Sequence, residues 1–225
     1  MGAGGILPGN FPVDLVLFGM IAAFLVLRLR SILGRRQGFE RTAAPPAPPV
    51  RPAVAAAPVI DGVAERPPSR ALPDPASPAG QAMARMQRLD RSFSAARFLD
   101  GAETAFRMIV TAFAAGQRDA LRPLLAEDML AAFTAAITAR ETAGETQRSD
   151  IRGIEVATIE AADLRGSVAD ITVRFVSDQV TLTTGRDGAI VAGTDAVTEI
   201  VDLWTFERDL GTADPTWRLV AARSA

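Results

Sequence analysis

The sequence contains no cysteine, histidine, tyrosine or lysine among its 225 residues. The lack of cysteine excludes disulfides, thiolate catalysis and cysteine-bound metals. The lack of histidine removes the usual proton acceptor near neutral pH and the commonest protein ligand of metal ions. Catalysis would have to use Asp, Glu, Arg, Ser or Thr alone. We therefore expect a protein that is not an enzyme and holds no metal or cofactor.

Charge of one sign does not dominate the chain either. The 24 basic residues, all of them arginine, nearly balance 26 acidic residues and leave a net charge of −2. This balance gives no general attraction to nucleic acid. Hydrophobic residues make up 48% of the chain. That is enough to bury the core of one domain of roughly 100–150 residues.

One long apolar run stands near the N-terminus, at residues 15–27, without a charged or polar side chain. A bilayer-spanning helix needs about 20 residues, so this run must extend at both ends. Pro12 and Asp14 suit a first helical turn, and Arg28 and Arg30 can reach past Leu29 toward headgroups. The alternative is a buried core helix, for which no neighbouring element is available. We predict a single transmembrane helix over residues 12–33.

Arginine is concentrated on one side of this predicted helix. No basic residue precedes position 28, whereas a cluster follows: Arg28, Arg30, Arg35, Arg36 and Arg41. A secretory signal has its positive charge before the apolar run. The arginines could contact the phosphates of a nucleic acid, but the interleaved leucine and isoleucine and the preceding apolar run fit a membrane better. The positive-inside rule predicts an outside N-terminus and a cytoplasmic C-terminal domain in a bacterial inner membrane.

Proline then dominates a long segment, because 11 of the 15 prolines fall between residues 42 and 80. Such a composition cannot form a packed core and is typical of an extended, partly polyproline linker. We assign residues 34–80 to the arginine-rich segment that ends the membrane anchor and to a disordered linker. The linker would hold the following domain away from the membrane.

The remaining sequence, residues 81–225, reads as helices followed by strands, which indicates an α+β domain. An amphipathic helix is expected over 81–94, and residues 95–225 are assigned to the main domain. Within that domain, spacings of three and four predict helices over about 95–115 and 127–141. Gly101 inside the first of these should cost up to about 1 kcal/mol relative to alanine. We expect a close helix–sheet contact to explain it.

Strands are expected at 151–161, 167–184, 196–208 and 216–223, with a turn at 186–188. The apolar side chains of the second strand change parity, from odd positions such as Phe175 to even positions such as Val176. A β-bulge in this strand would produce that change and bend the sheet. Helices against one bent antiparallel sheet would form a cone with an internal hollow.

Three stretches resemble the Tim44-like domain family, known from mitochondrial inner-membrane import and from bacterial relatives. They are FLDGAETAFRMIVTAFAAGQRDALRPLL (98–125), DLWTFERDL (202–210) and DPTWRLV (214–220). The matching positions are Phe98, Leu99, Gly101, Ala102, Ala105, Phe106, Ile109, Ala112, Phe113, Gly116, Leu124, Leu125, Trp204, Phe206, Arg208, Pro215, Trp217 and Leu219. The stretch LRLRSILGRRQGFE (27–40) is similar to the bacterial members. The resemblance covers the anchor and residues 90–223.

The resemblance implies a nuclear-transport-factor-two-like cone with an apolar pocket, acting as a membrane-associated scaffold that meets anionic phospholipid such as cardiolipin. Two positions depart from the family pattern: Gln117 stands where Asp is usual, and Thr216 where Asn is frequent. The long N-terminal region that the mitochondrial member uses toward the import chaperone is replaced here by anchor and linker. Chaperone tethering therefore does not carry over residue by residue.

Two groups of residues are candidates for binding. Arg85, Arg88 and Arg91 could meet lipid headgroups while Met83, Met86, Leu89 and Phe93 enter the bilayer; the alternative is a helix packed on the domain. The pocket candidates are Phe175, Asp202, Trp204, Phe206 and Trp217, for which ordinary core packing is the alternative. Asp202 could be an acid in the hollow, or an Asp on a solvated face.

The sequence thus favours a non-catalytic inner-membrane scaffold or tether that presents a lipid- or protein-binding domain in membrane-protein translocation or biogenesis. Its expected partners are the membrane and a membrane protein or chaperone, and not nucleic acid. The alternatives are a lipid carrier or sensor that uses the pocket and, less favoured, a small-molecule isomerase or dehydratase.

Overall fold

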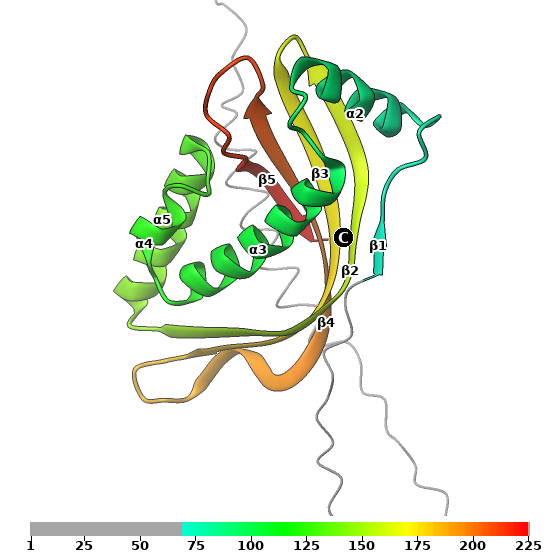
Figure 1. Cartoon of the computed structure of the whole chain (residues 1–225). Coiled ribbons are helices and arrows are strands. Elements are labelled where there is room, and N and C mark those ends of the chain that lie inside the picture. Colours follow the sequence, from blue (N-terminus) through cyan, green and yellow to red (C-terminus); the bar gives the residue numbers. More distant parts are fainter. Residues whose placement is uncertain (1–68, 225) are drawn as a thin grey trace, which may run out of the picture.

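A computed structural model describes residues 69–224 (Figure 1). The elements in chain order are β1 (Ser69–Ala71), α2 (Pro78–Leu89), α3 (Ala95–Ala114), α4 (Arg118–Leu121), α5 (Glu127–Ala143), β2 (Thr146–Arg165), β3 (Val168–Thr184), β4 (Ile190–Asp209) and β5 (Arg218–Ser224). The predicted transmembrane helix, residues 12–33, lies outside the described residues. Among the described helices, none is long and apolar enough to cross a membrane.

The helix ends follow local sequence signals. Ser77 caps α2, its hydroxyl accepting from the N–H of Gly80 at 3.1 Å, and proline occupies the first helical position. Ser94 caps α3, which stops before Gly116 with φ of +70°. Glycine reaches this left-handed region without the steric penalty of a side chain. Arg140 of α5 donates to the last carbonyls of α3, at Phe113 (2.9 Å) and Ala114 (3.0 Å).

The mixed α+β class is confirmed: helices pack against one five-stranded sheet in the order β1-β2-β3-β4-β5. Strands β2 to β5 form an antiparallel meander, whereas β1 pairs in parallel with β2. Arg70 of β1 holds this edge to α3 through Glu103, with Nε and Oε1 2.8 Å apart, and through Asp100. Residues 69–80, assigned by composition to the linker, therefore form β1, a turn and the start of α2.

The sheet bends as expected, but β3 pairs regularly with β4 at the parity change near Phe175 and Val176, where we predicted a bulge. Pairing of β3 with β4 runs without interruption from Val173 to Gln179. Extra residues lie in β2, where the register shifts between Ile151 and Gly153, Ile154 and Val156, and Ile159 and Ala161. Others lie in β4, opposite the steps from Gln179 to Thr181 and from Thr183 to Thr184 of β3. The parity change in β3 has another cause, since Ser177 and Gln179 continue the buried odd face beyond Phe175.

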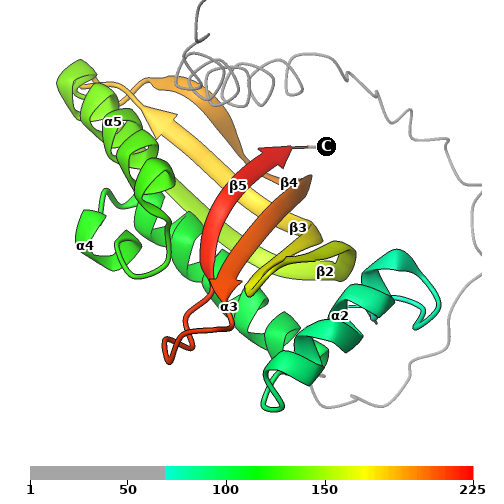
Figure 2. The ribbon, with the colours of Figure 1, turned by 90° about the horizontal axis from the view of Figure 1, so that it is seen from above.

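The core lies between α3 and the concave side of the sheet (Figures 1 and 2). Phe106 is fully buried, stacks on Phe175 with centroids 4.5 Å apart, and meets Trp204 at 4.6 Å. Burying rings of this size contributes several kcal/mol each to folding. The sheet bends around α3 (Figures 1 and 2).

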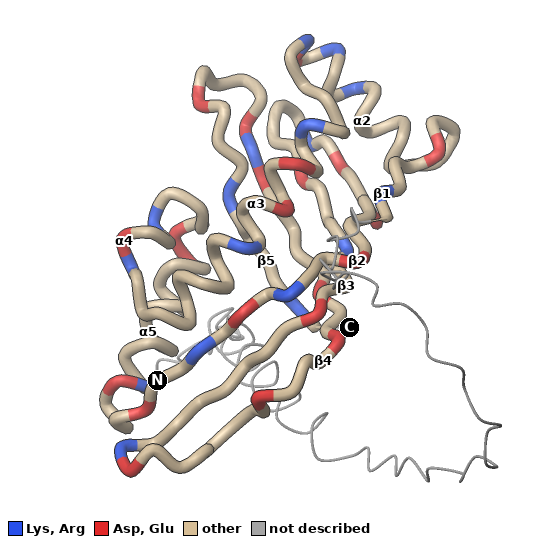
Figure 3. The backbone as a smooth tube through the Cα atoms, turned by 60° about the horizontal axis from the view of Figure 1, so that its bottom comes forward, with Lys and Arg blue, Asp and Glu red and all other residues tan. Residues whose placement is uncertain are grey.

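Helix α2 packs its apolar face on this domain. Met83 and Met86 are 8% and 0% exposed and belong to the core, while Leu89 stays 49% exposed. Packing, the alternative we considered for this face, is therefore the arrangement observed for the two methionines. Basic positions occur along α2 and in the segment that follows it (Figure 3), and Arg85, Arg88 and Arg91 are exposed. Their contact with lipid stays a prediction.

Candidate functional site

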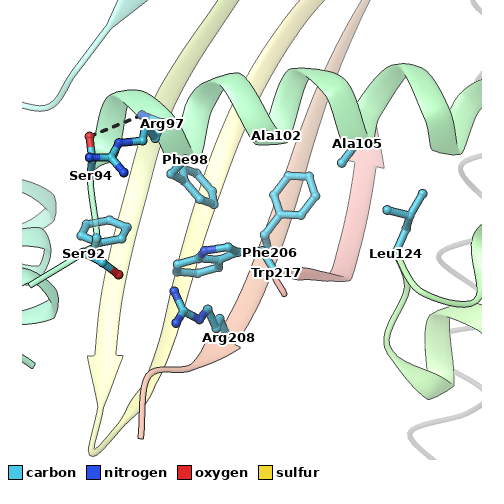
Figure 4. Close-up of a pocket in the computed structure, with 12 residues that line it drawn as sticks. Ser92, Ser94, Arg97, Phe98, Ala102, Ala105, Leu124, Phe206, Arg208 and Trp217 are labelled. Atoms are coloured by element: carbon cyan, nitrogen blue, oxygen red, sulfur yellow. Dashed lines mark hydrogen bonds between the residues drawn. The ribbon is translucent and has the colours of Figure 1, made fainter. Parts of the chain in front are cut away.

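A cavity of about 310 Å³ opens beside the first half of α3, where β4 ends and β5 begins (Figure 4). Its lining residues are Ser92, Phe93, Ser94, Arg97, Phe98, Gly101, Ala102, Ala105, Leu124, Phe206, Arg208 and Trp217. The volume lies at the lower end of the range for small-molecule sites. The cavity therefore admits a ligand of modest size or part of a larger one.

Aromatic rings form one wall of the cavity. The Trp217 ring lies 4.8 Å from that of Phe98 and 6.1 Å from that of Phe93, and Phe98 meets Phe206 edge-on at 6.1 Å. Edge-to-face contacts of this kind fix ring orientation as well as burying area. The wall is a rigid apolar surface contributed by α3, β4, the segment before α3 and the residue before β5.

A turn before β5 positions the indole of Trp217. Asp214 accepts from the N–H of Thr216 at 2.9 Å and pairs with Arg218 at 3.0 Å. The hydrogen bonds from Thr216, followed by that from Arg218, lower the pKa of Asp214 to about 2. The turn therefore keeps its negative charge at neutral pH and orders the residues on both sides of Trp217.

Arg208 forms the polar part of the cavity floor but is already engaged. Its Nη1 lies 3.1 Å from Oδ2 of Asp90, and its Nε donates to the carbonyl of Asp214 at 3.1 Å. Oδ1 of Asp90 accepts both the N–H and the hydroxyl of Ser92, at 2.8 and 2.6 Å. These two bonds, and then the charge of Arg208, hold the pKa of Asp90 below its ordinary value.

Arg97 is the second arginine that lines the cavity, and its surroundings differ from those of Arg208. It lies in the first turn of α3, where no acidic residue is present. A cation at this end of a helix is opposed by the helix dipole, so its position is not explained by helix stability. Within residues 69–224 its guanidinium makes no ion pair, whereas Arg208 pairs with Asp90.

Gly101 lines the same cavity, and our explanation for it was wrong. A Cβ built at Gly101 would meet no heavy atom within 4 Å outside its immediate surroundings, so no close helix–sheet contact requires glycine. Its φ is also ordinary for a helix, since the residues with positive φ are elsewhere. Glycine destabilises a helix relative to alanine, and packing does not explain why glycine occupies this position.

The structure divides the predicted pocket residues into two sets. Phe206 and Trp217 line the cavity, whereas Phe175 and Trp204 lie in the core against Phe106. Asp202 is 4% exposed and accepts from the hydroxyl of Ser224 at 3.1 Å. Asp202 is not among the residues that line the cavity, so it does not supply the acid that the isomerase alternative needs there.

The predicted lipid and topology residues are not part of this cavity. Arg85, Arg88 and Arg91 are exposed on and just after α2. The cluster Arg28, Arg30, Arg35, Arg36 and Arg41 lies outside the described residues. Sequence reasoning did not predict that Ser92, Ser94, Arg97 and Arg208 line a cavity, although Arg208 was among the positions that match the family. The helical spacing of Arg97, Gly101 and Ala105 could have indicated a common face, but not that this face borders a cavity.

These features define a mixed α+β domain with an apolar cavity, suited to binding a partner or ligand. The chain belongs to the Tim44-like domain family, whose match extends over residues 79–224. Domains of this family are non-catalytic scaffolds that associate with membranes and protein partners. The predicted family is thus confirmed, and the match includes α2 as well as the helices and strands that follow it.

Comparisons with curated proteins and with solved structures do not extend this family assignment. No curated protein matches the chain. The intermembrane space region of the chloroplast protein ARC6 is 11% identical, with a TM-score of 0.43, covering 59% of this chain and 97% of that one. A conserved protein from Planctomyces limnophilus DSM 3776 is 15% identical, with a TM-score of 0.30, covering 54% and 90%.

Proposed function

We propose that this protein is a membrane-tethered scaffold on the cytoplasmic face of a bacterial inner membrane, acting in membrane-protein translocation or biogenesis. The observation that carries the proposal is the Tim44-like match over residues 79–224. The apolar run at 15–27, followed by arginine, supplies the tether and the orientation. The bent sheet around α3 supports the nuclear-transport-factor-two-like cone form of the domain.

Helix α2 supplies a second contact with the membrane in this proposal. Arg85, Arg88 and Arg91 are exposed, and they follow the linker that leads from the anchor. Each arginine near an anionic lipid surface contributes about 1 kcal/mol to binding. The apolar face of α2 is occupied by the sheet, so this contact would be electrostatic, with anionic phospholipid such as cardiolipin.

Affinity purification from gently solubilised membranes tests the scaffold role. The full chain should retain a translocase component, a chaperone or another membrane protein. A control bait made of residues 1–68 alone separates partners of the described domain from proteins that merely share the membrane. Recovery of the same proteins with both baits, or of none with the full chain, would contradict the scaffold role.

Vesicle flotation tests the lipid contact with residues 69–225. Binding should require cardiolipin and fall when Arg85, Arg88 and Arg91 are replaced by glutamine. A matched variant that loses Arg122, Arg148 and Arg152, which are exposed elsewhere, should bind like the parent chain. Equal losses in both variants would indicate a general charge effect and remove the assignment to α2.

A reporter fused after Ala225 tests the orientation. The arginines that follow the apolar run predict a cytoplasmic C-terminus. A reporter active only in the cytoplasm should therefore give signal, and one active only in the periplasm should not. A periplasmic reporter signal would overturn the topology and the function that depends on it.

A further inference from the structure

We propose that β1 is a releasable clasp, which attaches the linker to the edge of β2 and, when it opens, moves the point at which the linker leaves the domain. Residues 69–73 form the releasable arm, and the turn that begins at Asp74 is the fixed end. The use of this clasp to set the reach of a membrane tether rests on the proposed function. The opening and closing of β1 do not depend on it.

Strand β1 stands apart from the helices and the long strands (Figure 1). It is three residues long, all of them exposed, and it pairs in parallel with residues 156–158 of β2. It also precedes residues 79–224, the part of the chain that matches the Tim44-like family. Because the proline-rich segment leads directly into Ser69, β1 decides where that segment joins the domain.

Little buried surface holds β1 in place. The next residue along the chain, Leu72, is also 54% exposed. Parallel pairing is slightly less stable per residue than antiparallel pairing, and Pro67, Pro68 and Pro73 cannot donate hydrogen bonds to a ladder. Segments with few buried apolar contacts open at the lowest free energy. We therefore expect β1 to detach while the core strands stay folded.

The side chain of Arg70 is the latch of the clasp. Its Nε and Nη2 donate to Oε1 and Oε2 of Glu103, at 2.8 and 3.0 Å, and its Nη1 donates to Asp100. This two-pronged contact with a carboxylate is among the stronger ion-pair geometries. Water nevertheless reaches it, since the side chains of Arg70 and Asp100 are 43% and 57% exposed. Salt should therefore weaken the latch by screening its charges.

The turn after the arm is built to stay on the domain. The carbonyl of Asp74 accepts the N–H of Ser77 at 2.9 Å and its hydroxyl at 2.6 Å, while the Asp74 carboxylate accepts the N–H of Ala76 at 2.8 Å. A Cβ on Gly80 would lie 2.2 Å from the carbonyl oxygen of Asp74, so the turn and the first turn of α2 pack without room for a side chain. Opening therefore stops at Asp74.

Release of the arm changes the geometry of the attachment. An extended chain spans about 3.3 Å per residue, so a detached Ser69 could move within roughly 17 Å of Asp74. The attachment would shift from the edge of β2 to the N-terminal end of α2. A closed clasp thus holds the domain by the side of its sheet, whereas an open clasp lengthens the tether and holds the domain by α2.

Distances between two spin labels in the full chain, kept in detergent, test the clasp. The sequence has no cysteine, so Ser69→Cys with Ala139→Cys gives one labelled pair at two exposed positions, in β1 and α5. At low salt we expect one narrow distance population, for the closed clasp, and a minor broad population for the open one. Raising NaCl from about 0.05 to 0.5 M should increase the broad population about threefold.

A substitution tests the latch in the same labelled chain. Arg70→Gln should raise the broad population about tenfold, the change expected when a charge-assisted contact is lost. Arg122→Gln removes an exposed arginine that follows α4 and should leave the distances unchanged. Equal changes in the two variants would indicate a general charge effect and overturn the assignment to Arg70.

A covalent lock tests opening without labels. Ala71 and Thr158 are partners in the ladder, so Ala71→Cys with Thr158→Cys should form a disulfide that keeps β1 closed. Trypsin cleaves after Arg70 only when the arm is open, so oxidation should slow this cut at least about tenfold relative to the reduced protein. Cleavage after Arg186, in the exposed turn before β4, should not change and is the internal control.

Two further results would overturn the clasp. One is a distance distribution that neither salt nor Arg70→Gln alters. The other is cleavage after Arg70 that the disulfide does not slow. Both measurements are made in detergent, so neither depends on whether residues 12–33 span a membrane. A periplasmic signal from the reporter after Ala225 would overturn the proposed function and leave the clasp in place.

Discussion

Nη1 of Arg208 lies 3.1 Å from Oδ2 of Asp90, and this ion pair joins the end of α2 to the end of β4 beside the cavity. The two side chains are only 13% and 15% exposed. Ion pairs in such settings are screened less by water and salt than surface pairs. The pair therefore fixes α2 on the domain and also neutralises one of the two cations that line the cavity.

Removing both partners of this pair should destabilise the domain by less than the sum of the two single losses. Asp90→Asn and Arg208→Gln each leave one half-buried charge without its partner, and each should lower the free energy of unfolding by about 1–3 kcal/mol. Urea denaturation of both single variants and the double variant should give a coupling energy of about 1 kcal/mol. Additive losses would show that the pair contributes no mutual stabilisation.

The turn that positions Trp217 should make stability depend on pH. The pKa of Asp214 falls from its ordinary value of 3.8 to about 2 in the folded state. Because the unfolded state then binds the proton more tightly, this carboxylate stabilises the fold above pH 4, and the contribution is lost as the pH falls from about 4 to 2. Asp214→Asn should flatten this part of the stability profile.

The measurement is urea denaturation at several pH values between 6 and 2. Asp195→Asn, an exposed carboxylate on β4, controls for the general loss of negative charge. Profiles of equal slope for the two variants below pH 4 would contradict the role assigned to Asp214.

The aromatic core should be the main source of stability. Phe106 is fully buried between Phe175 and Trp204, so Phe106→Ala should cost about 3–5 kcal/mol. Met108, on the same helix, is 48% exposed, and Met108→Ala should change stability by no more than about 0.5 kcal/mol. Similar losses for the two variants in thermal or urea unfolding would mean that α3 does not pack as described.

Two glycines at α3 should respond oppositely to alanine. Gly101→Ala should stabilise the domain by up to about 1 kcal/mol, because the added methyl meets open space in a regular helix. Gly116→Ala should destabilise it by about 1 kcal/mol or more, because φ there is +70°. Urea midpoints measure both changes. A destabilising Gly101→Ala would show that the fold needs glycine at this position.

Much of the fold could be predicted from local patterns. The periodicity of three and four located α3 and α5 to within two residues, because their apolar side chains face one core. The strands were located, but β2 and β4 are longer than expected, since bulges and polar ends blur the alternation. The short strand β1 was missed because a proline-rich composition hides three residues that pair with a sheet edge.

The candidate site could be predicted only in part. Phe206 and Trp217 were expected at a pocket and are there, but Phe175 and Trp204 have the same aromatic character and lie in the core. Strand parity could not separate them, because all of these side chains face the helices. The separation depends on where α3 crosses the sheet, which no local pattern specifies.

The sequence by itself determined the composition limits, the helices, the Tim44-like resemblance and the placement of arginine after the apolar run. These depend on residue type and spacing along the chain. Only the tertiary structure decided that Arg208 is paired with Asp90, that Arg97 is not paired within the described domain, and that Gly101 faces a cavity. These facts depend on distances between segments far apart in sequence, and those distances are set when the sheet bends around α3.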